Sequence, residues 1–158
     1  LREKSPGTKI ILTEPENAAL IGSEVKQDRH NDNTPASSHS SWNPHLIQGW
    51  TPDFIPFVLQ EAIDNNYFDE LLPVSGDQGI VWAKRLARAE GIITGISGGS
   101  TFAIAMEVAK KAPPDCNILC MLPDTGERYL SSPLFEDIPE DMTEEEKEIS
   151  TSTPNYQL

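Results

Sequence analysis

Long apolar runs, basic residues and cysteines are all scarce in this sequence of 158 residues. No stretch approaches the roughly 18 to 20 apolar residues that a membrane span needs, and no signal peptide opens the chain, so we expect no contact with a membrane. Lys and Arg number 12 against 25 Asp and Glu, for a formal net charge of -13. This charge repels the phosphates of nucleic acids and anionic lipid surfaces, so we expect neither as a partner.

The two cysteines, Cys116 and Cys120, stand in the segment PPDCNILCML. Four residues apart on a strand they share a face, but they lie too far apart along it to form a disulfide. We expect both to be small apolar side chains in a buried strand, without a metal or redox role. This use of cysteine favours a reducing setting, cytoplasmic or in an organelle stroma.

Residues that bind metals or form Schiff bases are also few. The histidines lie in or beside a polar stretch without metal-ligand spacing, so we expect no metal site: His30, His39 and His45. The lysines of the central segments fall on amphipathic or terminal helical positions that face water: Lys84, Lys110 and Lys111. None is typical of a buried Schiff-base lysine, and we expect no catalytic residue in this chain.

Strand-like and helix-like segments alternate along the first 124 residues. Short apolar runs bounded by Pro or Gly predict buried strands, and apolar residues at helical spacing predict amphipathic helices. We expect strands over 8–15, 71–74 and 117–124. We expect three helices: one over 55–62 with Pro56 in its first turn, a second between an N-cap at Ser75 and a C-cap at Gly91, and a third from near Ser100 to Ala109. This order predicts an α/β fold, part of an open, mostly parallel twisted sheet with helices on both faces.

Two stretches stand outside this alternation. Residues 30–44, HNDNTPASSHSSWNP, are polar and aperiodic, and predict a long loop. Residues 135–150, FEDIPEDMTEEEKEIS, hold much of the acidity. We therefore expect a main unit over residues 1–135 and an acidic C-terminal tail or helix over residues 136–158.

The glycine-rich stretch GISGGST, residues 95–101, leads into a helix. Glycines allow the backbone to approach a ligand closely, and a helix N-terminus favours an anion by about 0.3–1 kcal/mol. The spacing fits neither G-x-G-x-x-G nor a P-loop with its lysine. A ligand site and a plain tight turn in which Ser97 or Ser100 caps the helix both remain open at this point.

Two further turns are candidates. In PHLIQGWTPDFIP, residues 44–56, Gly49 could place backbone beside a ligand with Trp50 as a wall; the alternative is a turn with an aromatic cover. LPDTGERYLSS, residues 122–132, directly follows a predicted strand, and ligands of open α/β sheets lie at the carboxyl ends of strands. The alternative there is a strand exit fixed by an ion pair of Glu127 and Arg128 with neighbours, with the next two residues packing back.

With these motifs in order, the chain resembles the C-terminal half of cysteine synthase (O-acetylserine sulfhydrylase), a pyridoxal-phosphate enzyme of the tryptophan-synthase-β-like fold, fold type II. KIILTEPENAAL resembles the family's strand and following turn, and HLIQGWTPDFIP its H-x-I-Q-G…F-I-P segment. GIITGISGGSTFAIAMEVA resembles the G-I-x-x-G-I-S-x-G stretch, and ILCMLPDTGERYLSSPLF a strand followed by P-x-x-G-E-R-Y-L-S. One departure is clear: many relatives have a second glycine soon after Gly49, where this chain has WTPD.

The resemblance implies that pyridoxal 5'-phosphate is the cofactor and that Ser97 faces its pyridine nitrogen. A neutral hydroxyl partner leaves that nitrogen largely unprotonated, so the ring is a moderate electron sink suited to β-elimination. The same matching puts Gly49 close to the cofactor and the bound amino acid, and Pro123 and Asp124 near the ring nitrogen. Because residues 30–44 directly precede the Gly49 segment, we expect that loop near the mouth of the active site.

The reaction implied by the resemblance is β-replacement of O-acetyl-L-serine with sulfide, which gives L-cysteine and acetate. The family is usually a homodimer, and some relatives bind a serine acetyltransferase. The family's Schiff-base lysine and phosphate-binding loop lie upstream of the matched motifs. Since the sequence opens with LREKSPGTKIILTEP, without Met and directly into a strand, we expect a fragment that does not catalyse the reaction alone.

Two alternatives stay open. A related β-replacement enzyme, such as a cystathionine β-synthase or a cyanoalanine synthase, would share the motifs and use other substrates. A non-catalytic stand-alone domain that binds a partner would belong to another functional class. Half a sheet exposes a wide apolar edge and face, which favours the enzyme fragment over the stand-alone domain.

Overall fold

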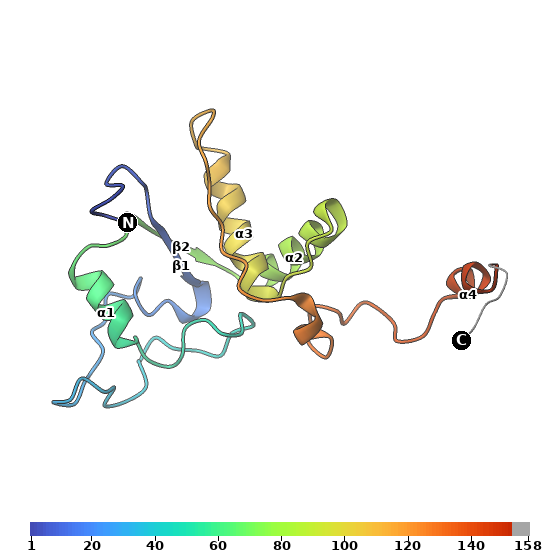
Figure 1. Cartoon of the computed structure of the whole chain (residues 1–158). Helices are drawn as coiled ribbons and strands as arrows, with labels where there is room; N and C mark the ends of the chain where they lie inside the picture. Colours follow the sequence, from blue (N-terminus) through green and yellow to red (C-terminus); the bar gives the residue numbers. More distant parts are fainter. Residues whose placement is uncertain (153–158) are drawn as a thin grey trace.

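The computed structural model describes residues 1–152. Along the chain its elements are β1 (Ile11–Pro15), the short 3-10 helix η1 (Glu16–Ala18), α1 (Phe57–Asp64), β2 (Glu70–Val74), α2 (Gly76–Glu90), α3 (Ile96–Ala109), the 3-10 helix η2 (Gly126–Tyr129) and α4 (Glu144–Thr151). Figure 1 shows α2 and α3 beside the two strands, with α4 apart from the rest at the end of an extended segment.

The two strands pair in parallel, with Ile11 opposite Glu70 and Pro15 opposite Val74. Parallel neighbours need a long crossover, and here residues 16–69 supply it, including α1. The α/β class and the two strands predicted at 8–15 and 71–74 are confirmed. Helix α1 starts two residues later than predicted: Pro56 has the extended ψ of 147° and stands before the first turn rather than in it.

Helix α2 follows its sequence signals closely. The Ser75 hydroxyl accepts from the Gln78 backbone N–H at 3.1 Å, and the Gln78 side chain accepts from the Ser75 N–H, which completes a capping box. At the other end Gly91 adopts the left-handed φ of 69°, as its role as C-cap requires. Both predicted caps are confirmed.

Helix α3 begins at Ile96, four residues before the predicted start near Ser100, and Gly95 is its N-cap. Of the alternatives left open for this stretch, the one in which Ser97 or Ser100 caps the helix is wrong. Both serines lie inside the helix, and the Ser100 hydroxyl instead donates back to the Ile96 carbonyl at 2.9 Å. Serine side chains inside a helix commonly bond to the carbonyl four residues earlier, so they give no free cap.

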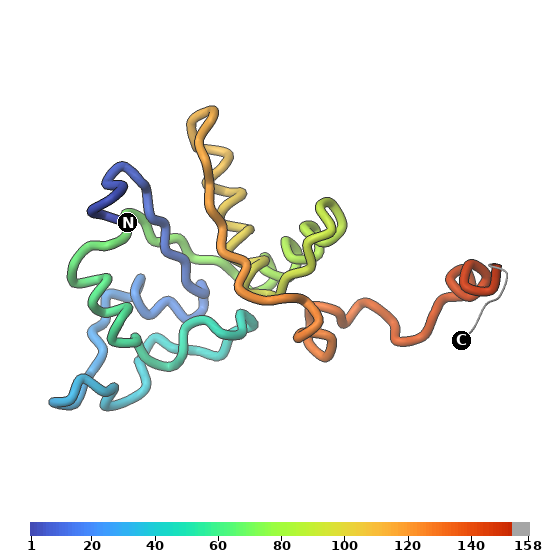
Figure 2. The backbone as a smooth tube through the Cα atoms, in the orientation of Figure 1, coloured from blue at the N-terminus to red at the C-terminus, as the bar shows by residue number. Residues whose placement is uncertain are grey.

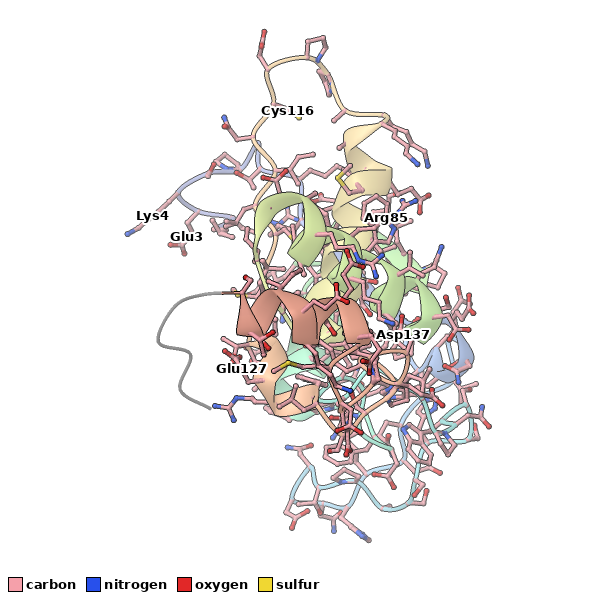
Figure 3. All side chains as sticks on the ribbon, turned by 90° about the vertical axis from the view of Figure 1, so that its right-hand side faces the viewer. Glu3, Lys4, Arg85, Cys116, Glu127 and Asp137 are labelled. Atoms are coloured by element: carbon pink, nitrogen blue, oxygen red, sulfur yellow. The ribbon has the colours of Figure 1, made fainter. Side chains whose placement is uncertain are left out.

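Helices α2 and α3 meet backbone to backbone. A Cβ at Gly99 would collide with the Gly79 carbonyl oxygen and lie 2.8 Å from the Ala83 Cβ. Further along the contact, Trp82 meets the ring of Phe102 edge-on with 5.7 Å between centroids, and Arg85, labelled in Figure 3, lies 5.0 Å from the Trp82 ring. Two glycines therefore set the spacing, and aromatic side chains close the contact on its outer side.

The predicted strand over residues 117–124 does not form in the part of the chain that the structure describes. After α3 the chain turns back toward the base of that helix, where Thr94 and Thr125 form an isolated antiparallel bridge (Figure 2). Leu119 and Met121 are 97% and 68% exposed, whereas Cys120 is half-buried. The alternation of a strand is present, but no neighbouring strand among residues 1–152 completes its hydrogen bonds.

Both cysteines are therefore less buried than predicted. Cys116 is exposed in the loop that follows α3, where Figure 3 labels it, and Cys120 is half-buried. Burial raises the pKa of the Cys120 thiol. Both are free thiols, and the expectation that they are buried strand residues was wrong because the strand itself is absent.

The core has two parts. The larger cluster joins the sheet, α2, α3 and the turn after residue 122 through eight buried residues: Ile47, Val74, Ala83, Ile96, Ala103, Ile104, Tyr129 and Leu134. The smaller cluster consists of Ala18, Leu20 and Ile55, with Trp42 packed against it. Residues 30–44 form the irregular loop that the sequence predicts, and Trp42 of this loop packs against the smaller cluster.

The acidic C-terminal region contains α4, which begins with a capping box between Thr143 and Glu146. This helix lies within the tail predicted over residues 136–158, of which residues 153–158 fall outside the described residues. Asp137, labelled in Figure 3, connects the region to α2 through an ion pair with Lys84. None of the helices within residues 1–152 combines the length and the apolar character needed to cross a membrane.

Replacing Gly99 with Ala tests the helix contact. The added methyl would overlap the Gly79 carbonyl, so we expect the free energy of unfolding to fall by about 1–3 kcal/mol or more. Gly7→Ala is the matched control, because nothing lies within 4 Å of a Cβ there. Urea unfolding of the two variants measures the difference, and an equal midpoint for both would contradict the backbone contact.

Candidate functional site

The first turn of α3 is buried in the protein. Residues 96–100 are all buried, and Ser97 is only 3% exposed. The N-cap Gly95 is extended and offers no side chain to the free N–H groups of this turn. The sequence thus places a neutral hydroxyl at the buried, electropositive start of a helix.

Asp124 and Tyr129 pack against this helix start. The Tyr129 hydroxyl donates to Asp124 Oδ2 at 2.6 Å. A Cβ at Gly95 would lie 2.7 Å from Asp124 Oδ1 and would also collide with the Tyr129 ring. Only glycine at position 95 leaves room for both side chains, so this glycine serves the close approach of neighbouring groups.

The turn that carries Asp124 is fixed to the segment before α3. The Thr94 hydroxyl donates to the Asp124 carbonyl at 3.1 Å, and the Gly126 N–H donates to the Ile93 carbonyl at 3.3 Å. Thr94 is almost fully buried. These bonds hold Asp124 beside the start of α3, while the neighbouring Pro123 is exposed.

The ion pair suggested for this turn is not present among the described residues; η2 instead depends on the buried Tyr129. Tyr129 packs back as expected, but Leu130 is 70% exposed. Burial raises the pKa of Tyr129, and the adjacent Asp124 carboxylate raises it further. The phenol therefore stays protonated and donates a hydrogen bond to the Asp124 carboxylate.

Ser97 is left with a hydroxyl that can donate. Its side chain lies near enough to the Tyr129 phenol to oppose, by hydrogen bonding, part of the rise in the pKa of Tyr129. Because the phenol hydrogen is already directed at Asp124, Tyr129 offers Ser97 an acceptor and not a donor. Asp124 Oδ1 is itself buried and has no partner within the described residues.

Gly49 belongs to a different part of the molecule. It has the left-handed φ of 84° and lines a hollow of about 400 Å³ formed by residues 11–14, 20–21, 49–52, 54–56 and 59. Ser97, Pro123 and Asp124 are not among these lining residues. Trp50 lines the hollow and also packs against the larger core cluster, so both the wall and the aromatic cover suggested for it are compatible with its place. The structure thus brings Ser97 and Asp124 together around Tyr129 and leaves Gly49 in the wall of the hollow.

The hollow is mostly apolar. Its polar side chains include Thr13, whose Oγ1 is buried without a partner in the described chain, and Glu14. The Glu14 carboxylate already accepts from the backbone N–H groups of Ile21 and Gly22 at 3.0 and 2.8 Å. It therefore fixes the turn after η1 and is not free for a ligand.

Sequence patterns gave no sign that Thr51 is unusual. It has a φ of 38°, a left-handed conformation that costs a β-branched residue about 1–3 kcal/mol. Its carbonyl accepts hydrogen bonds from Trp42 Nε1 and His45 Nε2, both at 3.1 Å. Trp42 and His45 lie in or beside the polar loop of residues 30–44. Hydrogen bonds from the second half of that loop therefore hold the Gly49 segment.

Other chemistry finds little support in residues 1–152. No three His, Cys, Asp or Glu side chains gather there into a possible metal site. The lysines in this part of the chain are exposed or half-exposed, and Lys84 and Lys111 form ion pairs with Asp137 and Glu107. The candidate site is therefore the start of α3 with its neighbours Asp124 and Tyr129.

The family model for pyridoxal-phosphate dependent enzymes matches residues 1–124, well over half of the chain. This chain belongs to that family. Pyridoxal phosphate is the cofactor of the family, and the resemblance to cysteine synthases seen in the sequence motifs is confirmed.

Curated relatives agree with this placement. An O-ureido-L-serine synthase of Streptomyces lavendulae is 38% identical over 140 residues, which cover 89% of this chain and 37% of that protein. A probable cysteine synthase of Bacillus subtilis (strain 168) is 38% identical over 102 residues, 65% of this chain and 32% of that protein. The chain thus spans about two fifths or less of the length of these relatives.

Solved structures show the same fold. The crystal structure of O-ureido-L-serine synthase superposes with a TM-score of 0.73 at 36% identity, covering 95% of this chain and 41% of that one. Cysteine synthase from Entamoeba histolytica superposes with a TM-score of 0.64 at 28% identity, over 90% and 36% of the two chains. The fold is that of the fold type II enzymes of this family.

The residues at the start of α3 fit the pyridine end of the cofactor. A pyridine nitrogen accepts a hydrogen bond, and the buried residue Ser97 has a hydroxyl that can donate one, with the Tyr129 phenol as its acceptor within the chain. The roles of Ser97, Gly49, Pro123 and Asp124 in binding the cofactor remain predictions.

Tyr129→Phe should destabilise the protein. It leaves both oxygens of the Asp124 carboxylate unpaired in a half-buried position, so we expect a loss of about 1–3 kcal/mol of unfolding free energy. The raised pKa of Tyr129 adds a pH dependence. The stability due to its protonated form is complete below the usual value of 10.0 and is lost as pH rises through the higher folded value.

Denaturant unfolding from pH 8 to pH 11 checks this. The difference between the wild type and Tyr129→Phe should shrink above pH 10. The exposed Tyr67 provides the control Tyr67→Phe. A difference that stays constant over the whole range, or an equal loss in the control, would contradict the assignment.

Proposed function

We propose that this chain supplies the pyridine-ring side of a pyridoxal-phosphate enzyme that replaces the β-substituent of O-acetyl-L-serine. With sulfide as the nucleophile the products are L-cysteine and acetate. The cofactor, when bound, supplies the electron sink that lets the α-proton and the β-substituent leave.

The observation that carries the proposal is the neutral, buried hydroxyl of Ser97 at the start of α3. A hydroxyl can donate to a pyridine nitrogen but is far too weak an acid to protonate it. A carboxylate in its place would favour a protonated ring and a stronger electron sink. A moderate sink suits elimination at the β-carbon, as the sequence motifs also imply.

The neighbours of Ser97 support this role. Asp124 accepts the hydrogen of Tyr129, so the phenol does not compete as a donor for the ring nitrogen. Thr94 and Gly126 fix the turn that carries Asp124. The first turn of α3 is buried, and a hydrogen bond is stronger in such surroundings than in water.

A second nucleophile has specific support. Among the curated relatives, the O-ureido-L-serine synthase matches over 89% of this chain, more than the 65% of the probable cysteine synthase at the same 38% identity. O-ureido-L-serine carries a ureido group on its β-oxygen. Its formation from O-acetyl-L-serine would take hydroxyurea, whose oxygen bonds to the β-carbon as acetate leaves and whose proton passes to solvent.

Competition between the nucleophiles tests the function. The full-length protein that contains this chain, loaded with the cofactor and called the holoenzyme below, is supplied with O-acetyl-L-serine and equal concentrations of sulfide and hydroxyurea, and the products are measured by mass spectrometry. We expect L-cysteine as the main product. A dominant O-ureido-L-serine would replace sulfide with hydroxyurea in the proposal, and the absence of both products with the cofactor bound would contradict β-replacement.

Ser97→Asp tests the role of the hydroxyl. A carboxylate would raise the protonation of the ring nitrogen, so the visible absorbance of the bound cofactor should shift and turnover should fall at least about tenfold, a barrier change of roughly 1.4 kcal/mol. Ser100→Ala is the control, since that buried serine lies one turn later and bonds to the Ile96 carbonyl. An unchanged spectrum and rate in Ser97→Asp would remove Ser97 from the site.

A further inference from the structure

Two aromatic side chains hold one backbone carbonyl in the wall of the hollow. Trp42 Nε1 and His45 Nε2 both lie 3.1 Å from the Thr51 oxygen. A carbonyl only accepts, so the hydrogen of the His45 contact must reside on Nε2. The two donors use both lone pairs of the oxygen, and we name Trp42, His45 and the Thr51 carbonyl the brace.

The backbone at Thr51 needs such support. Gly49 has a φ of 84°, which glycine adopts freely, but Thr51 has a φ of 38°, which a β-branched residue resists. Pro52 follows directly and restricts the residue before it further. The left-handed conformation at position 51 is one that glycine would hold unaided, and in this chain the brace holds it instead.

The brace is anchored on both sides. Trp42 packs against the core cluster of Ala18, Leu20 and Ile55. The same loop, residues 30–44, also binds Asp53: the His39 N–H donates to the Asp53 carbonyl at 2.6 Å, and the Ser38 hydroxyl donates to the Asp53 side chain. The loop is thereby joined to residues 51–53 at several points.

We infer that Trp42 and His45 are positioning residues that shape the binding site for the amino-acid substrate by holding the Gly49–Thr51 wall. The inference rests on the proposed function and on the family resemblance, which implies that Gly49 lies close to the bound amino acid. Gly49, Trp50 and Thr51 all line the hollow of about 400 Å³. Loss of the two donors frees this wall, whereas Ser97 stands on another element and keeps its place. Substrate affinity should therefore change more than the rate of the chemical step.

The test uses the holoenzyme and its Trp42→Phe/His45→Phe variant, which keeps an aromatic ring at both positions and removes both donors. L-alanine serves as the probe, because it has the α-amino and carboxylate groups of the substrate but no β-substituent to lose. Its dissociation constant is read from the absorbance of the cofactor, and KM and kcat for O-acetyl-L-serine are measured alongside. Asn43→Ala is the matched control: it removes one hydrogen bond of the same loop, from the Asn43 side-chain amide to the Asn17 carbonyl.

We expect the dissociation constant of L-alanine and the KM to rise about three- to tenfold in the double variant, the loss of one to two neutral hydrogen bonds, with kcat within about twofold. Asn43→Ala should lower the melting temperature without this rise. In a Thr51→Gly background the effect of losing the donors should become smaller, because glycine keeps the conformation without help. Should the double variant not fold, His45→Phe alone must still raise the constant.

An unchanged dissociation constant in the double variant, or an equal rise in Asn43→Ala, would overturn the positioning role. A wild-type holoenzyme whose absorbance does not respond to L-alanine would instead contradict the proposed function itself. The two failures are thus told apart by the wild type.

Discussion

Helix α2 packs against α3 at Gly79 and Gly99, where a Cβ on either glycine would collide with the other helix, and the candidate site depends on this contact. The close approach draws the first two turns of α3 into the core, so Ser97 is buried although it is polar. A buried hydroxyl without a required protein acceptor is costly unless it serves a ligand or a neighbour. The packing of two helices thus creates the chemical character of the site.

The polar side chains that surround the start of α3 each donate a hydrogen bond to one fixed acceptor. Thr94 donates to the Asp124 carbonyl, and Tyr129 donates to the Asp124 carboxylate. The hydroxyl of Ser97 is left as the available donor. The hollow of the Gly49 segment is a second feature, built from other elements and fixed by the polar loop. The proposed enzyme needs both: one to meet the cofactor ring, the other to meet the amino acid.

Local signals predicted much of this fold. The capping box at Ser75 and the glycine at 91 mark the ends of α2 because both act within a few residues of the chain. The start of α3 was placed four residues late, since burial of Ile96 against the core decides it and no local cap marks it. The strand predicted over 117–124 has the right alternation, but a strand forms only with a neighbour, which sequence periodicity does not reveal.

For the site, the motif around Ser97 drew attention to the turn that forms the buried start of α3, and Asp124 lies beside it. The bond between Tyr129 and Asp124 could not be predicted from spacing alone, because its partners also suit a simple packed turn. The left-handed conformation of Thr51 could not be predicted either, because a threonine rarely adopts it. It is stabilised here by hydrogen bonds from residues 42 and 45.

The central claim is that the Ser97 hydroxyl donates to an unprotonated pyridine nitrogen. Nitrogen-15 NMR of the holoenzyme, loaded with cofactor labelled at the ring nitrogen, measures this directly. The account predicts the chemical shift of a neutral, hydrogen-bonded pyridine nitrogen, which moves toward the value without a hydrogen bond in Ser97→Ala. The shift of a pyridinium in the wild type, or a shift indifferent to Ser97→Ala, would contradict it.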